Sequence, residues 1–162
     1  MSSGYRRRRN ELAQYFEPEA GAPEPLRACC ERRVRFEEVD PLRIAWHGRY
    51  VSYFEDGRVA FGHKYGLSYA EFMERKVAAP IVQLHLDYLT PLEFDELFTI
   101  EASLHWSEAM RLNFSFAIRK EDSKLAATGY SVQMLTDLRG NVLFFPPEWV
   151  LGFREKWRSG TW

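Results

Sequence analysis

The chain has only two cysteines among its 162 residues, and they are adjacent, at Cys29 and Cys30. Adjacent cysteines are badly placed to bridge two elements of structure, so no disulfide framework is predicted. They form no zinc motif, and His63, His85 and His105 are scattered without the spacing of metal ligands. We therefore expect a protein that needs no metal and works in the reducing cytoplasm.

The chain also lacks an excess of one charge and any long apolar run. Its 22 lysines and arginines nearly balance 23 acidic residues, and nucleic-acid binding without sequence preference needs a strong basic excess. No apolar run reaches the roughly 18 residues that span a membrane. The arginines near the N-terminus are not followed by the apolar stretch of a secretory signal. We expect neither nucleic acid nor a membrane among its partners.

Hydrophobic residues are abundant, at 46% of the chain, and 15% of the residues are aromatic. A chain of this length and composition can bury the core of one domain. Residues 1–28 differ from the rest, because they combine arginines with a stretch rich in Pro, Gly, Ala and Glu. We predict a mobile N-terminal tail and linker over residues 1–28 and a folded domain over 29–162. Deletion of the tail should then leave the melting temperature nearly unchanged.

The most organised stretch lies between residues 33 and 66. Residues 33–39 alternate, with Val34 and Phe36 on one face, and predict a half-buried strand. A turn follows, and a long helix begins near Gly48 and ends at Gly66. One face of this helix repeats at three- and four-residue steps, which predicts burial against a sheet: Tyr50, Tyr53, Phe54, Gly57, Ala60, Phe61 and Tyr65.

Alternating runs after the helix predict strands at 82–88, 98–106, 112–118 and 126–134, with a short last strand at 142–145. Ser68 and Glu71 predict a capping box for a short helix at 69–75. Two prolines precede a terminal helix at 148–157. Because consecutive strands joined by short turns are antiparallel, the predicted class is α+β, with one antiparallel sheet wrapped around one long central helix.

The run from Asp40 to Arg58 reads Asp-x-x-x-Ile-x-Trp-His-Gly-x-Tyr-x-x-Tyr-Phe-Glu-x-x-Arg. It resembles the signature of hotdog-fold acyl-CoA thioesterases of the 4-hydroxybenzoyl-CoA thioesterase type. Pro80-Ile-Val and the turn around Pro91 match later parts of that family, so the resemblance covers about residues 32–150. Arg43 departs from the pattern, because the family usually has glycine there. Either the turn differs in shape or the mouth of the site carries an added charge.

The resemblance implies a hotdog fold that assembles as a homodimer or homotetramer. It implies hydrolysis of an acyl-CoA or acyl carrier protein thioester, with no cofactor other than the coenzyme A of the substrate. Two alternatives stay open. A hotdog dehydratase would resemble His-Phe-Pro ahead of the helix, where this chain has Trp46-His47-Gly48. A hotdog protein that binds or scaffolds acyl groups without catalysis is the other.

Asp40 is the first candidate for chemistry. An aspartate carboxylate is ordinarily ionised at neutral pH and can attack a thioester carbonyl or activate a water for that attack. The alternative is a turn aspartate that accepts backbone N–H bonds beside Pro41. The resemblance puts Asp40 at the family's catalytic aspartate, as nucleophile or general base.

His47 and Gly48 precede the helix, whose first N–H groups suit a developing oxyanion. Gly48 would let a substrate carbonyl approach the backbone, and His47 would donate a hydrogen bond to the same oxygen or hold the water. His47 is otherwise a polar residue at a helix start. Tyr50, Trp46 and Phe54 are candidate walls of an acyl pocket, or else core side chains.

Overall fold

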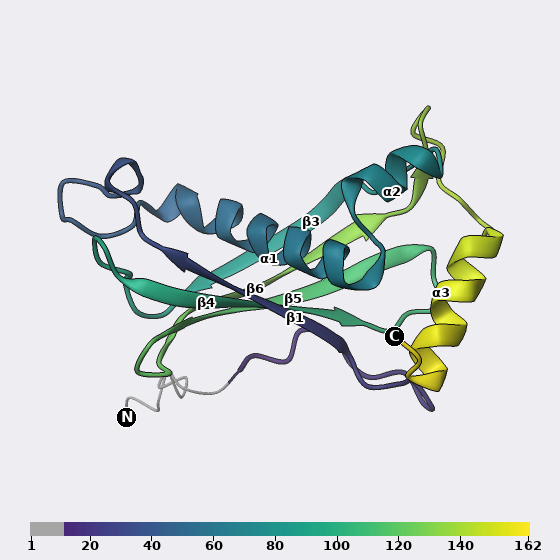
Figure 1. The fold of residues 1–162 in the computed structure, drawn as a ribbon, viewed down its shortest axis with the longest axis horizontal. Helices are drawn as coiled ribbons and strands as arrows, with labels where there is room; N and C mark the ends of the chain where they lie inside the picture. The colour runs from purple at the N-terminus through teal and green to yellow at the C-terminus, as the bar shows by residue number, and fades with distance from the viewer. Residues whose placement is uncertain (1–11) are drawn as a thin grey trace, which may run out of the picture.

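The computed structural model describes residues 12–162; the arginines at positions 6–9 of the predicted tail lie outside this range. Helix α1 (Tyr50–Tyr65) lies along one face of an antiparallel sheet (Figure 1). Within the described residues this sheet has five strands in the order β1-β4-β5-β6-β3. Their bounds are β1 Leu26–Arg33, β3 Ile81–Tyr88, β4 Leu97–His105, β5 Arg111–Lys120 and β6 Leu125–Met134. The predicted α+β class, a sheet wrapped around one long helix, is confirmed.

Shorter elements complete the fold at the end of the sheet where α1 stops. Helix α2 (Tyr69–Glu74) follows α1, strand β2 (Val77–Ala78) pairs with β7 (Thr136–Asp137), and α3 (Glu148–Ser159) ends the chain. The predicted capping box is present, because the Glu71 carboxylate accepts the backbone N–H of Ser68 at 2.8 Å and its hydroxyl at 2.7 Å. Gly66 caps α1 in the left-handed conformation, as predicted.

The aromatic face of α1 forms the core with the inner face of the sheet. Tyr53 is fully buried, and the Phe54 ring stacks on Phe116 of β5 with centroids 4.5 Å apart. At Gly57 a Cβ atom would lie 2.8 Å from a methyl group of Ile100. This glycine therefore lets the helix lie close to β4, and the helix position fixes where its N-terminus meets the sheet.

The predicted strand at 33–39 is wrong, because the strand lies earlier, at Leu26–Arg33. Val34 is buried as expected, but Phe36 is 79% exposed. Residues Phe36–Glu38 instead form a turn of 3-10 helix, η1, in which the Glu38 carboxylate accepts the backbone N–H of Arg35 at 2.8 Å. A side chain that captures a nearby N–H group competes with extended structure.

The predicted strand at 142–145 is also wrong. Only an isolated bridge between Thr136 and Val142 forms there, and Phe144 and Phe145 are largely exposed. The Asp137 carboxylate accepts backbone N–H groups of Arg139 and Asn141, which folds the chain into a local turn instead.

Part of the predicted tail is seated on the sheet. The Tyr15 hydroxyl donates to the Asp87 carboxylate at 2.9 Å and lies 2.7 Å from the Thr128 hydroxyl, while the Phe16 ring packs near His105. This segment runs beneath the sheet, on the side away from α1 (Figure 1). The predicted boundary at residue 28 also falls inside β1.

Deletion of residues 1–28 should therefore lower the melting temperature by more than a few degrees, against the expectation from composition. The deletion removes three residues of β1 along with the contacts of Tyr15. In the full chain, Tyr15→Ala combined with Phe16→Ala should cost about 1–2 kcal/mol, or about 3–6 °C. Differential scanning calorimetry measures both. An unchanged melting temperature in the double variant would show that the seated segment adds no stability.

Candidate active site

A tightly folded loop carries the first candidate residues. It joins η1 to a second turn of 3-10 helix, η2 (His47–Arg49), which leads directly into α1. The N–H of Asp40 donates to the carbonyl of Ile44 at 2.9 Å. The N–H of Trp46 donates to the Glu38 carbonyl at 2.8 Å, and this bond joins the two ends of the loop, which we call its base. The loop is also tied to the β3–β4 connection, because Ala45 N–H donates to the Leu92 carbonyl at 2.8 Å. It is thus held by backbone bonds on two sides.

Arg43 occupies the left-handed region within this loop, with φ at 61°. Its N–H donates to the Asp40 carbonyl at 2.9 Å, and its carbonyl accepts the N–H of Phe94 at 3.0 Å. Glycine adopts this conformation freely, whereas a residue with a Cβ is strained there. The turn therefore takes the backbone shape that suits the glycine usual in the resembled family, and Arg43 adds an exposed charge to it.

Asp40 is half-buried, and its two carboxylate oxygens differ. Oδ1 accepts the backbone N–H of Leu42 at 2.8 Å, the bond expected of a turn aspartate. Among residues 12–162, Oδ2 has no hydrogen-bond donor. Because the bond to Leu42 orients the carboxylate, the second oxygen is held in place and remains able to accept a proton or attack.

A cavity of about 360 Å³ joins this carboxylate to the start of the helix. Its lining comes from the loop, from α1 and from the segment that leaves β3: Asp40, Ile44, Ala45, His47, Tyr50, Tyr88, Leu89, Thr90 and Pro91. Three of the predicted site residues, Asp40, His47 and Tyr50, therefore share one cavity. The first N–H groups of a helical segment have no partner within it, so we expect the segment that begins at His47 to offer hydrogen-bond donors at this cavity.

The His47 ring is exposed and lies against the Trp46 ring, with centroids 4.8 Å apart. The His47 carbonyl accepts the hydroxyl of Tyr88 at 2.7 Å. Tyr88 thus ties the end of β3 to the start of the helical segment. It also lines the cavity, and sequence reasoning assigned it only to a strand.

Tyr50 contributes to both the core and the cavity. Its hydroxyl accepts the N–H of Leu92 at 3.3 Å, and its ring packs edge-on against Tyr88 at 5.1 Å. Burial raises the pKa of Tyr50, and burial likewise raises the pKa of Tyr88. Both phenols therefore keep their protons at neutral pH and are hydrogen-bond donors rather than bases.

The structure separates the other three predicted residues from this cavity. A Cβ at Gly48 would lie 2.1 Å from the Trp46 ring, so the absence of a side chain at Gly48 makes room for that indole. Trp46 is itself 48% exposed. Phe54 lies farther along α1 and lines a second cavity of about 370 Å³ with Glu55, Arg58, Ile81, Leu84, Phe116 and Ser131 among others. This second cavity lies between α1 and the edge strand β3.

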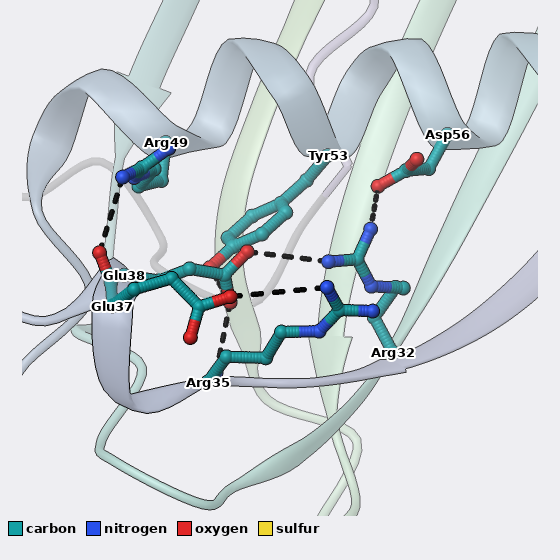
Figure 2. A network of polar contacts seen from close by, with 7 residues as sticks. All are labelled: Arg32, Arg35, Glu37, Glu38, Arg49, Tyr53 and Asp56. Atoms are coloured by element: carbon teal, nitrogen blue, oxygen red, sulfur yellow. Dashed lines mark hydrogen bonds and ion pairs between the residues drawn. The ribbon is translucent and has the colours of Figure 1, made fainter.

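Glu38 is the residue that sequence reasoning missed. Figure 2 shows its carboxylate at the centre of a polar network between β1 and α1. It accepts Arg32 Nη2 at 3.2 Å and the Tyr53 hydroxyl at 3.1 Å. Alternation along residues 33–39 could not have found it, because that strand does not form and Phe36, on the same predicted face, is 79% exposed.

Residues 12–162 contain no group of three side chains able to hold a metal ion together. Over the same range, no helix combines the length and the apolar character needed to cross a membrane.

Comparison with known proteins defines the class. The model of the thioesterase-like superfamily matches residues 34–153, and the chain belongs to that family. The predicted hotdog fold and thioesterase relationship are therefore confirmed. A provisionally named esterase of Aquifex aeolicus is 27% identical over 117 residues, covering 72% of this chain and 90% of that protein.

The acyl-CoA thioester hydrolase YbgC of Escherichia coli O6:H1 is 23% identical over 93 residues, covering 57% of this chain and 69% of its own. Among solved structures, a DHNA-CoA thioesterase from Staphylococcus aureus superposes with a TM-score of 0.72. It is 21% identical, and the match covers 80% of this chain and 89% of that one. At that identity the superposition supports the fold alone.

Arg43→Gly should stabilise the protein by about 0.5–1 kcal/mol, because glycine removes the Cβ strain at a positive φ but costs more chain entropy on folding. Arg43→Ala is the matched control, since it removes the same charge and keeps the Cβ. Urea unfolding measures both. If Arg43→Gly is no more stable than Arg43→Ala, the left-handed turn is not strained.

Proposed function

We propose that this chain hydrolyses an acyl-CoA thioester to a free acid and coenzyme A, at the cavity that contains Asp40 and His47. The observation that carries the proposal is the pairing of an oriented carboxylate, whose Oδ2 accepts no bond among residues 12–162, with the N-terminal end of a helical segment on one cavity. Membership in the thioesterase-like superfamily supports it. So does the sequence similarity to the acyl-CoA thioester hydrolase YbgC.

The thioester carbonyl oxygen points toward the first N–H groups of the segment that begins at His47. These groups, with the partial positive charge of a helix N-terminus, stabilise the negative charge that develops on that oxygen. The exposed His47 ring adds a donor to the same oxygen or holds the attacking water. Gly48 leaves room for the Trp46 indole rather than for the substrate, because a Cβ there would lie 2.1 Å from that ring.

Asp40 supplies the nucleophile in one of two ways. As a general base, its Oδ2 takes a proton from water while the water oxygen bonds to the carbonyl carbon, and the carbon–sulfur bond then breaks to release the thiolate. As a nucleophile, Oδ2 bonds to that carbon itself, and water hydrolyses the resulting anhydride after the thiolate has left. Neither route calls for a metal or redox cofactor. Acyl carrier protein is the alternative carrier of the thioester, and the unpaired cysteines favour work in the cytoplasm.

Asp40→Asn should abolish turnover, because it keeps the side-chain shape and removes the charge needed for attack. Affinity for a non-hydrolysable acyl-CoA analogue should stay within about tenfold, or about 1.4 kcal/mol. His47→Ala should be milder, at roughly 10²–10³ in rate, if His47 donates to the oxyanion. The assay is release of free thiol from a panel of acyl-CoAs, with acyl carrier protein thioesters in parallel.

Thiol release and analogue binding, measured together, distinguish a hydrolase from a protein that only binds acyl groups. A normal rate in Asp40→Asn would end the proposed role of the carboxylate. Binding of the analogue by the unmodified protein, without thiol release from any thioester, would instead favour an acyl-binding protein without catalysis.

The active unit that we propose is a homodimer or a dimer of dimers, paired through β3. Among residues 12–162 this strand pairs with β6 on one side, and no strand of that range pairs with its other edge. It also exposes Ile81, Val82 and Leu84 beside the second cavity, whereas the carbonyl of Arg27 on the other edge strand already accepts Tyr65 and Lys64. An open edge with apolar side chains is an association site, and a second copy would continue the sheet.

Mixed dimers test whether each site uses one aspartate. Tagged protein co-expressed with Asp40→Asn should give mixed dimers with about half the rate of the unmodified dimer, because only one of the two sites keeps its carboxylate. Pure dimers of each type are the controls. Sedimentation at assay concentration checks the assembly, and a fully active monomer would contradict the dimer proposal.

A further inference from the structure

Glu38 is a charged residue at a place where charge is costly. It is only 7% exposed and lies at the junction of β1, η1 and α1. Burial of a carboxylate away from water is unfavourable unless hydrogen bonds and an opposite charge compensate. An apolar side chain would pack at this position at lower cost, which raises the question of what the carboxylate does beside the loop of Asp40.

The carboxylate is compensated from three elements. Oε2 accepts the N–H of Arg35 at 2.8 Å and the hydroxyl of Tyr53 at 3.1 Å, while Oε1 accepts Arg32 Nη2 at 3.2 Å. Arg32 also pairs with Asp56 on α1, so the guanidinium bridges two acids (Figure 2). Burial raises the pKa of Tyr53, and the negative charge of Glu38 raises it further, so this phenol remains a donor.

The backbone of Glu38 belongs to the base of the candidate catalytic loop. Its carbonyl accepts the N–H of Trp46 at 2.8 Å, directly before His47. Asp40 follows Glu38 by two residues and lies within the loop that this bond closes. Glu38 therefore bonds to α1 through its side chain and closes the loop through its backbone carbonyl.

We infer that Glu38 is a positioning residue for the proposed hydrolase, setting the Asp40 carboxylate relative to the N-terminal end of the helical segment. The inference rests on the proposed function for its effect on rate. Its structural part does not, because the network ties the loop to α1 whatever the substrate. The ion pair and the Tyr53 bond act on the loop, and Asp40 acts on the thioester.

Glu38→Gln tests the charge with little change in shape. The amide keeps one acceptor oxygen but replaces the other with an NH₂ donor. That NH₂ must face either Arg32 or the Arg35 N–H and the Tyr53 hydroxyl, all of which need an acceptor. A loop that shifts by about 1 Å can lose on the order of 10² in rate. We expect kcat to fall about 10- to 100-fold with KM changed less than about threefold. Tyr53→Phe removes one bond and should lower kcat about three- to tenfold.

Glu71→Gln is the matched control. Glu71 also accepts a backbone N–H and a hydroxyl, both from Ser68, but in the capping box of α2 rather than beside the loop. It should lower the melting temperature and leave kcat unchanged. Rates are compared well below the melting temperature of each variant, so that the folded fraction is equal.

Hydrogen–deuterium exchange supplies a readout that needs no activity. Backbone amides of residues 39–47 should exchange at least about tenfold faster in Glu38→Gln and should match the unmodified protein in Glu71→Gln.

The outcomes separate the two ideas. Unchanged kcat and unchanged exchange in both Glu38→Gln and Tyr53→Phe would overturn the inference while leaving thioester hydrolysis intact. An unmodified protein without thioesterase activity, but with faster loop exchange in Glu38→Gln, would overturn the proposed function and keep the positioning role. If Glu38→Gln does not fold, Tyr53→Phe decides by the same two measurements.

Discussion

Burial of the ring-rich face of α1 against the sheet is the constraint on which the other features depend. Tyr53, Phe54 and Phe61 leave water together, and stacking of Phe54 on Phe116 fixes the helix on β5. Gly57 allows the close approach to Ile100. Since removal of apolar area from water is the dominant favourable term in folding, this contact determines where the helix ends point. The candidate site lies at one of those ends.

Polar contacts then attach the loop to that rigid base. The side chain of Glu38 reaches Tyr53 on the buried face of α1, and Tyr88 reaches the His47 carbonyl from the end of β3. The loop carries the carboxylate, and the helical segment carries the N–H donors. Neither element forms the cavity alone, so the chemistry proposed for Asp40 depends on how two elements meet.

Much of the fold was predictable because local patterns and tertiary packing agree. The helix face, the capping box of Ser68 and Glu71, and the strands after residue 80 follow from periodicity and end signals that the structure keeps. Prediction failed at 33–39 and 142–145, where side-chain carboxylates of Glu38 and Asp137 capture backbone N–H groups and replace extended structure with turns. Alternation alone does not report such bonds.

At the candidate site, the residue types and their spacing can be read from the chain alone: an aspartate, a histidine seven residues later and a helix directly after it. The folded chain is needed to see that Asp40, His47 and Tyr50 share a cavity with Tyr88, and that Phe54 lines another. Packing also puts the Trp46 indole against Gly48 and the Tyr15 hydroxyl on the Asp87 carboxylate. Helical and strand periods depend on residues that are close along the chain, so a sequence reveals them. Cavities and buried charges depend on residues that are far apart along the chain and that packing brings together.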